Sequence, residues 1–208
     1  MTGRRARALL LGGAALSLAP RVRADEEPYL GLAVSVATES GAPVSDDSWI
    51  EAQIAAADEL IGPLGVHVRW RREKAIAEKH AHLETRADRD ALTGELEDRM
   101  INVFVVASLR DVDDPARQRM GVCWRHSRHP STPYLVIAKT ARPTVLAHEL
   151  GHFFGNAHSG VSDNVMSYTR TGGPVFFDDA QAAILRDLAQ RYLKAGTLLP
   201  TTPNRMWP

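Results

Sequence analysis

Residues 148–158 read HELGHFFGNAH, and this stretch decides how the rest of the chain is interpreted. His148 and His152 stand four residues apart, so on an α-helix they lie on one face, about 6 Å apart along the axis. Gly155 can adopt the left-handed conformation that ends a helix, and the chain can then turn back and deliver His158. The stretch therefore predicts a helix, a tight turn and three imidazoles that converge on one point.

Three converging imidazoles beside a carboxylate are typical of a catalytic zinc site. Catalytic zinc keeps three protein ligands and one open position, whereas structural zinc is bound by four protein groups. Glu149 stands next to the first histidine and can act as a general base on a water at the open position. The short pattern His-Glu-x-x-His also occurs on ordinary solvated helices, but the added glycine and third histidine make a chance match much rarer. A second element, NVMSY at residues 164–168, follows soon afterwards.

Together the two elements resemble the extended zinc signature and the methionine turn of the metzincin clan of metalloproteases. The resemblance implies one catalytic Zn²⁺ bound by His148, His152 and His158. It also implies that Glu149 is the general base and acid, and that Met166 packs beneath the metal ligands. The activity implied is hydrolysis of peptide bonds, with a peptide or protein as the substrate.

The marks of individual metzincin subfamilies are mixed in this chain. Ser159, directly after the third histidine, is similar to the family residue of matrixins, whereas residues 165–168 resemble serralysins and astacins. By that second resemblance, Tyr168 can donate a hydrogen bond to the developing oxyanion. The alternative for Tyr168 is an aromatic side chain that packs under the turn. The chain is therefore not assigned to one subfamily.

The order of predicted elements agrees with the fold that the resemblance implies. Alternating or continuous apolar runs predict strands at residues 29–38, 66–71, 100–107, 121–126 and 134–138. Apolar stripes with capping residues predict helices at residues 45–60, 143–154 and 178–194. We expect a single α+β domain that is metzincin-like, with a twisted, mostly parallel sheet, an antiparallel edge strand, the active-site helix, the methionine turn and a C-terminal helix.

Two segments have a special place in this prediction. Residues 121–126 are the favoured edge strand, to which an extended peptide can add as another strand. Residues 73–99 are highly charged and lack a strong apolar face, so we expect a surface excursion there, partly helical. Phe153, Phe154 and the loop at 160–174 are expected to shape the substrate pocket.

The first 24 residues resemble a signal peptide. Arg4, Arg5 and Arg7 precede an apolar stretch too short to remain in a membrane, and the sequence VRA at 22–24 resembles a cleavage site. We expect export by the general secretory route, with the Arg4-Arg5 pair leaving a twin-arginine signal as the alternative. The mature protein is then secreted or periplasmic, without a stable membrane anchor.

Domain limits and charge follow from this assignment. The catalytic domain is predicted at residues 25–199, followed by a flexible tail at 200–208. Residues 25–208 carry 20 basic and 25 acidic side chains, a net charge of −5. A mildly acidic chain without a basic stripe is a poor candidate for binding nucleic acid. The sequence leaves the oligomeric state open.

Cys123 is the only cysteine, so no disulfide can form within the chain. Because it lies in the predicted edge strand, its thiolate can in principle occupy the open metal position and hold an enzyme latent. The favoured alternative is a buried thiol that packs as a small apolar side chain.

The remaining histidines and a small acidic cluster carry weaker signals. His80 and His82 can belong to a second metal site, although their charged surroundings favour solvated side chains. His126 and His129 flank the edge strand, where surface placement is favoured over a position in the cleft. The other candidates are His67, Asp111, Asp113 and Asp114, the three aspartates being interpreted as loop residues.

The pattern as a whole favours a secreted zinc endopeptidase. One alternative is a zinc-binding interaction protein that uses the same scaffold without catalysis. Another is a protease dedicated to a single partner, which would look inactive on general substrates.

Overall fold

The computed structural model describes residues 29–126 and 133–201. The predicted signal peptide, His129 and residues 202–208 lie outside the described residues. Within the part of the chain that is described, no helix has the length and apolarity needed to cross a lipid bilayer.

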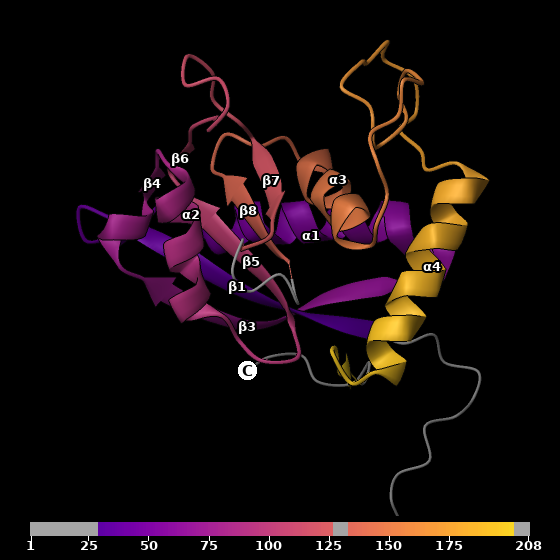
Figure 1. Cartoon of the computed structure of the whole chain (residues 1–208), viewed down its shortest axis with the longest axis horizontal. Helices are drawn as coiled ribbons and strands as arrows, with labels where there is room; N and C mark the ends of the chain where they lie inside the picture. The colour runs from indigo at the N-terminus through magenta and orange to yellow at the C-terminus, as the bar shows by residue number, and fades with distance from the viewer. Residues whose placement is uncertain (1–28, 127–132, 202–208) are drawn as a thin grey trace, which may run out of the picture.

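A twisted sheet forms the centre of the structure (Figure 1). Its main strands are β1 (Tyr29–Glu39), β3 (His67–Ile76), β5 (Ile101–Val106), β7 (Gly121–Trp124) and β8 (Tyr134–Ala138). Strand β1 pairs in parallel with both β3 and β5, and β5 pairs in parallel with β8. Strand β7 pairs antiparallel with β8 at the edge. The predicted mostly parallel sheet with an antiparallel edge strand is therefore confirmed.

Two short strands extend the ends of β1. Strand β2 (Ala42–Pro43) and strand β9 (Pro200–Thr201) each pair antiparallel with it, at opposite ends. Pro200 and Thr201, the first two residues of the predicted tail, therefore pair with the sheet.

Three helices share one buried core with the sheet. They are α1 (Asp47–Ile61), α3 (Thr144–Phe153) and α4 (Asp179–Lys194). Helices α1 and α3 lie against strands of the sheet. Alternate residues of β1, from Leu30 to Val36, belong to the same buried cluster as Ile50 of α1, Leu150 of α3 and Leu185 of α4. The limits of all three helices agree with the prediction to within about two residues. Their first turns are capped as expected for α1, by Asp46, and for α4, by Asp178.

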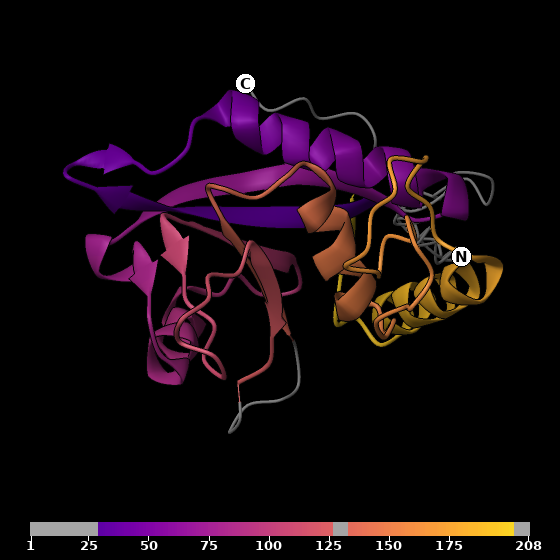
Figure 2. The same ribbon diagram turned by 90° about the horizontal axis from the view of Figure 1, so that it is seen from above.

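The opposite face of the sheet is covered by residues that the sequence suggested would be exposed (Figure 2). Between residues 73 and 99 lie the end of β3, the helix α2 (Arg86–Ala91), the strand β4 (His82–Leu83) and the 3₁₀ turns η2 (Glu78–His80) and η3 (Leu92–Glu95). Strand β4 pairs in parallel with β6 (Ser108–Leu109). Leu83 and Leu92 are completely buried against Phe104 and Tyr134. The segment is therefore a second layer of core, because isolated apolar residues from several short elements meet there without a regular period.

The two histidines of this segment differ in their surroundings. His80 is buried, contrary to the prediction of a solvated side chain. His82 is exposed, and its ring nitrogens contact Glu39 and Ser108. Since the two imidazoles are engaged in different environments, they do not form a second metal site with other described residues.

Candidate metal centre

Helix α3 and the turn after it bring three histidines together. His148 and His152 lie on one face of the helix, which ends at Phe153 and is followed by Gly155 with φ of 90°. The chain then reverses, and Nε2 of His158 lies 3.0 Å from Nε2 of His152. One ligand atom from each imidazole lies within 4.8 Å of the other two, and no other metal-ligating group of three is found among the described residues.

Backbone carbonyls orient the two helical imidazoles. Nδ1 of His148 donates to the carbonyl of Val165 (2.7 Å), and Nδ1 of His152 donates to the carbonyl of Asn156 (2.8 Å). A proton fixed on Nδ1 leaves the lone pair of Nε2 to face a metal. Burial lowers the pKa of His148 to about 4 and also lowers the pKa of His152 and His158. Three neutral imidazoles, two of them oriented by carbonyls, are a donor set that fits Zn²⁺.

Glu149 lies next to this cluster in a buried position. Glu149 is 5% exposed, and its carboxylate accepts a hydrogen bond from the backbone N–H of Cys123 on β7. Burial raises the pKa of Glu149 to about 8, while the hydrogen bond and the positive charge of Arg119 act in the opposite direction. A carboxyl group with a pKa near neutrality can both accept and release a proton under ordinary conditions.

The methionine turn lies below the histidines and is completely buried at Val165 and Met166. The backbone N–H of Met166 donates to the side-chain oxygen of Asn164 (2.8 Å). The side-chain amide of Asn164 also exchanges two hydrogen bonds with Gln181 on α4, at 2.8 and 3.1 Å. Asn164 and Gln181 were not predicted as site residues, since their pairing joins segments whose contact the sequence does not reveal.

A single arginine holds the same turn from the other side. The guanidinium of Arg170 donates to the carbonyls of Asn164, Ser167 and Thr169 through Nη1, and to the carbonyl of Val165 through Nη2. Because the Val165 carbonyl also accepts from His148, Arg170 and a candidate metal ligand share one acceptor. No feature of the sequence indicated this role of Arg170.

Tyr168 projects from the turn toward the histidines. Tyr168 is 68% exposed, and its hydroxyl lies 2.7 Å from Nε2 of His158. Arg119 approaches the same hydroxyl with Nη1 at 3.5 Å. The high exposure contradicts the alternative that Tyr168 packs under the turn.

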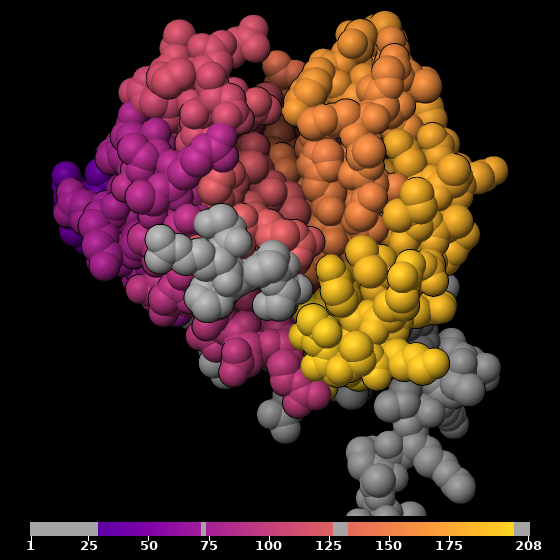
Figure 3. All heavy atoms as spheres, in the orientation of Figure 1, coloured from indigo at the N-terminus to yellow at the C-terminus, as the bar shows by residue number. Residues whose placement is uncertain are grey.

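A hollow opens above the histidines between the segment before β7 and the loop after α3 (Figure 3). The cavity has a volume of about 730 Å³, with Val145, His148 and Glu149 of α3 in its wall. Ser167, Tyr168 and Arg170 line it from the loop that was predicted to shape the pocket. Beyond β7, no strand of the described residues pairs with the outer edge of the sheet.

Two other predicted pocket residues do not reach the cavity. Phe153 and Phe154 are buried in the core, where both rings lie near Tyr192 of α4. The prediction that they shape the pocket was wrong, because the end of α3 turns toward α4 at this point.

Cys123 and His126 lie near the site in different ways. Cys123 lines a smaller recess together with Glu149 and the three histidines, but its sulfur is not among the donor atoms that converge within 4.8 Å. Burial raises the pKa of the thiol to about 12, which keeps it protonated. His126 lies 3.8 Å from the carboxylate of Asp90, on the side of the second core layer.

The sheet order, the helix with two histidines and the buried methionine turn together define the metzincin fold. Among solved structures, the chain is similar to mature mirolysin of Tannerella forsythia in complex with a cleaved peptide (13% identity, 84% of this chain and 100% of that chain, TM-score 0.60). It is similar to archaemetzincin of Methanopyrus kandleri (18% identity, 78% and 97%, TM-score 0.55). It is also similar to metalloproteinase-II of Bacteroides fragilis (15% identity, 80% and 54%, TM-score 0.59).

These likenesses confirm the fold and the resemblance that the sequence indicated. The chain spans about half the length of the Bacteroides protein, and nearly all or all of the other two. No protein-family model matches the sequence, and no curated protein matches it.

Proposed function

We propose that this protein is a zinc-dependent endopeptidase. The observation that carries the proposal is the convergence of three neutral imidazoles, two of them oriented by backbone carbonyls, beside the buried carboxylate of Glu149. The metzincin fold and the names of its structural neighbours support the same reaction class. Export is part of the proposal, and it is supported by the leader-like sequence of residues 1–24.

His148, His152 and His158 would hold the metal ion. Imidazole nitrogens bind several transition metals, but three histidines with one open position are the usual ligand set of catalytic zinc. When bound, Zn²⁺ supplies Lewis-acid polarisation of a carbonyl and lowers the pKa of a water molecule. Because the carbonyls of Val165 and Asn156 fix the imidazoles of His148 and His152, two of the three ligands are oriented before the metal binds.

Glu149 is the proposed general base and acid. It accepts a proton from the attacking water and then donates it to the leaving amine. The backbone N–H of Cys123 holds the carboxylate of Glu149 in place. The raised pKa of Glu149 suits both the acceptance and the release of the proton. Met166 supports the ligands from below without taking part in proton transfer.

Tyr168 and β7 are proposed to position the substrate. The Tyr168 hydroxyl lies among the histidines and is exposed to the cleft, so it can donate to an oxyanion that develops there. An extended peptide can pair with the outer edge of β7, which places its backbone alongside Glu149.

Metal analysis and cleavage profiling of the exported protein test this proposal. We expect about one Zn²⁺ per chain and cleavage of a broad peptide library that a chelator abolishes. Glu149→Ala should retain zinc while the cleavage rate falls at least about a hundredfold, which is the usual size of a general-base effect. His158→Ala should lose the metal, whereas the matched control His82→Ala should keep both zinc and activity, because His82 is exposed and remote from the cluster.

The alternatives predict other results. Zinc retention without cleavage of the library, or of any co-purifying protein, would indicate a non-catalytic interaction protein. Cleavage of one co-purifying protein alone would indicate a dedicated protease. Failure to bind zinc would refute the metal site itself.

A further inference from the structure

The wall of the cavity above the histidines carries an excess of positive charge. Four of its lining residues are arginines, and only two are acidic. The arginines are Arg117, Arg119, Arg142 and Arg170, and the acids are Asp111 and Glu149. With Glu149 ionised, the wall carries an excess of two positive charges before any metal is bound. Residues 25–208 as a whole carry a net charge of −5, so the positive charge is concentrated at the cleft.

Two of the four arginines already interact with other groups of the protein. The guanidinium of Arg170 donates hydrogen bonds to the carbonyls of the methionine turn. Arg117 is exposed and lies 3.5 Å from Asp114 on the neighbouring turn. Neither is therefore the best candidate to bind a ligand in the cavity.

Arg119 is held in a fixed orientation, and one of its nitrogens, Nη1, makes only a long hydrogen bond. Nε and Nη2 both contact Oδ2 of Asp111, at 2.9 and 2.7 Å. Asp111 is itself buried and fixed by the backbone N–H groups of Asp113 and Asp114. This arrangement points Nη1 toward the hydroxyl of Tyr168, at a distance of 3.5 Å that leaves room for a better acceptor.

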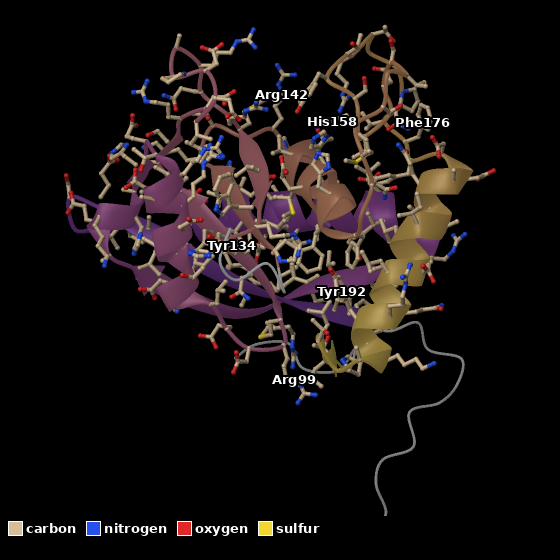
Figure 4. All side chains as sticks on the ribbon, in the orientation of Figure 1. Arg99, Tyr134, Arg142, His158, Phe176 and Tyr192 are labelled. Atoms are coloured by element: carbon tan, nitrogen blue, oxygen red, sulfur yellow. The ribbon has the colours of Figure 1, made fainter. Side chains whose placement is uncertain are left out.

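Arg142 is the one arginine of this wall whose side chain has no ion pair or hydrogen bond with the residues that the structure describes. It is exposed, and it lies two residues before the start of α3 at Thr144. Figure 4 shows Arg142 and His158 at the opening of the groove, on the segments that border it. A cation without a partner beside a fixed second cation is an arrangement that favours an anionic ligand.

The position of the two arginines relative to β7 indicates which part of a peptide they would meet. The backbone of Cys123 contacts Glu149, so the reacting bond lies near Cys123. Arg119 precedes Cys123 by four residues, which span about 13 Å in an extended chain. Antiparallel pairing is slightly more stable than parallel pairing. A peptide that runs antiparallel to β7 places its residues after the scissile bond beside Arg119.

We propose that Arg142 and Nη1 of Arg119 bind a carboxylate of the substrate, one to three residues after the scissile bond. This specificity rests on the proposed peptidase function and assigns its substrate class as acidic peptides. The carboxylate is either an Asp or Glu side chain or the C-terminus of a short peptide, since both present the same group to a guanidinium.

Matched peptides test the proposal by binding as well as by cleavage. The binding probe is a fluorescein-labelled decapeptide with three central Glu residues, compared with its three-Gln counterpart on zinc-loaded Glu149→Ala protein. We expect the Glu peptide to bind about tenfold more tightly, and the difference to shrink as salt rises. Arg142→Gln should remove most of the preference, Arg142→Glu should reverse it, and Arg186→Gln on α4 is the control that keeps it.

Cleavage adds the position and the source of the carboxylate. For a peptide cleaved by the wild type, kcat/KM is compared for Glu and Gln at each of three positions after the scissile bond. The cleavage of short peptides with free C-termini is then compared with that of the same peptides with amidated C-termini. This comparison distinguishes a terminal carboxylate from a side-chain carboxylate, and a preference for either supports the proposal. Equal Kd values for the Glu and Gln peptides, or a preference that survives Arg142→Glu, would overturn it. Because binding is measured without turnover, acidic preference without cleavage would refute only the peptidase function.

Discussion

The sulfur of Met166 lies directly against the backbone of Gly151, in the middle of α3. A Cβ atom at position 151 would lie 2.3 Å from Met166 Sδ and 3.2 Å from a ring carbon of Phe177. Both Gly151 and Met166 are fully buried. A glycine inside a helix costs about 1 kcal/mol relative to alanine. Its presence between two candidate ligands therefore follows from the close approach of the methionine turn.

We expect Gly151→Ala to destabilise the protein despite the higher helix propensity of alanine. The added methyl group must displace a buried side chain, which costs about 1–3 kcal/mol in a well-packed core. Displacement of Met166 should also shift the histidines, so zinc affinity should fall. Urea unfolding and chelator competition measure the two effects.

Gly94→Ala is the matched control, because a Cβ at position 94 meets no atom within 4 Å. The double variant with Met166→Ala should recover part of the loss caused by Gly151→Ala, since the two residues are in contact. An unchanged free energy of unfolding and an unchanged zinc affinity in Gly151→Ala would contradict this account of the packing.

Arg170→Gln should loosen the methionine turn and weaken zinc binding. The variant removes donors from four backbone carbonyls, including the Val165 carbonyl that orients His148. Loss of a partner that orients a metal ligand typically costs about 10- to 100-fold in metal affinity. We expect a zinc Kd at least about tenfold higher by chelator competition. Arg186→Gln, an exposed arginine with one contact to the carbonyl of Leu64, should leave the Kd unchanged. Equal Kd values in the two variants would exclude a positioning role for Arg170.

The stability of the metal-free protein should depend on Glu149 in a defined pH range. Burial raises the pKa of its carboxyl group from the ordinary 4.5 to about 8 in the folded state. Between these values the folded state holds a proton that the unfolded state has lost, so stability falls as the pH rises. The variant Glu149→Gln has no carboxyl group at this position, so this fall in stability with rising pH is absent. It should therefore be more stable than the wild type at pH 8, by an amount on the order of 4 kcal/mol, and equally stable near pH 4.5.

Urea unfolding of the zinc-free proteins at pH 5 and pH 8 measures this difference, with the exposed Glu51→Gln as the control. His148 acts with the opposite sign in both proteins: its pKa is lowered to about 4, so stability is lost as the pH falls from 6.5 towards 4. This contribution cancels when wild type and variant are compared at one pH. A difference between wild type and Glu149→Gln that does not grow with pH would show that Glu149 is already ionised in the folded state.

Cys123 should behave as a packed thiol rather than as a latency switch. Its pKa of about 12 and its burial against the core should make it react slowly with an alkylating reagent in the folded protein. Cys123→Ala should leave peptidase activity unchanged and cost about 1 kcal/mol of stability through lost packing. Activity assays before and after alkylation provide the measurement. A several-fold rise in activity on alkylation or substitution would instead support a thiol that blocks the metal position.

The features of this protein that depend on local periodicity could be predicted from its amino-acid pattern. The spacing of His148 and His152 follows from the pitch of one helix, and the positive φ of Gly155 follows from the turn that brings His158 back. Alternating and continuous apolar runs located the strands of the sheet, including the edge strand β7. Each of these signals is carried by residues that are neighbours in the chain, so no long-range contact is needed to interpret them.

Contacts between segments far apart in sequence became visible only in the folded domain. The pairing of Asn164 with Gln181, the burial of Leu83 and Leu92 against the sheet and the turn of Phe153 toward Tyr192 all depend on how separate elements pack. The same holds for the positive cleft, where Arg119 and Arg142 come from different elements. Such contacts leave no periodic pattern in the sequence, because the free energy that selects them arises from close packing and hydrogen bonds formed only when the whole domain assembles.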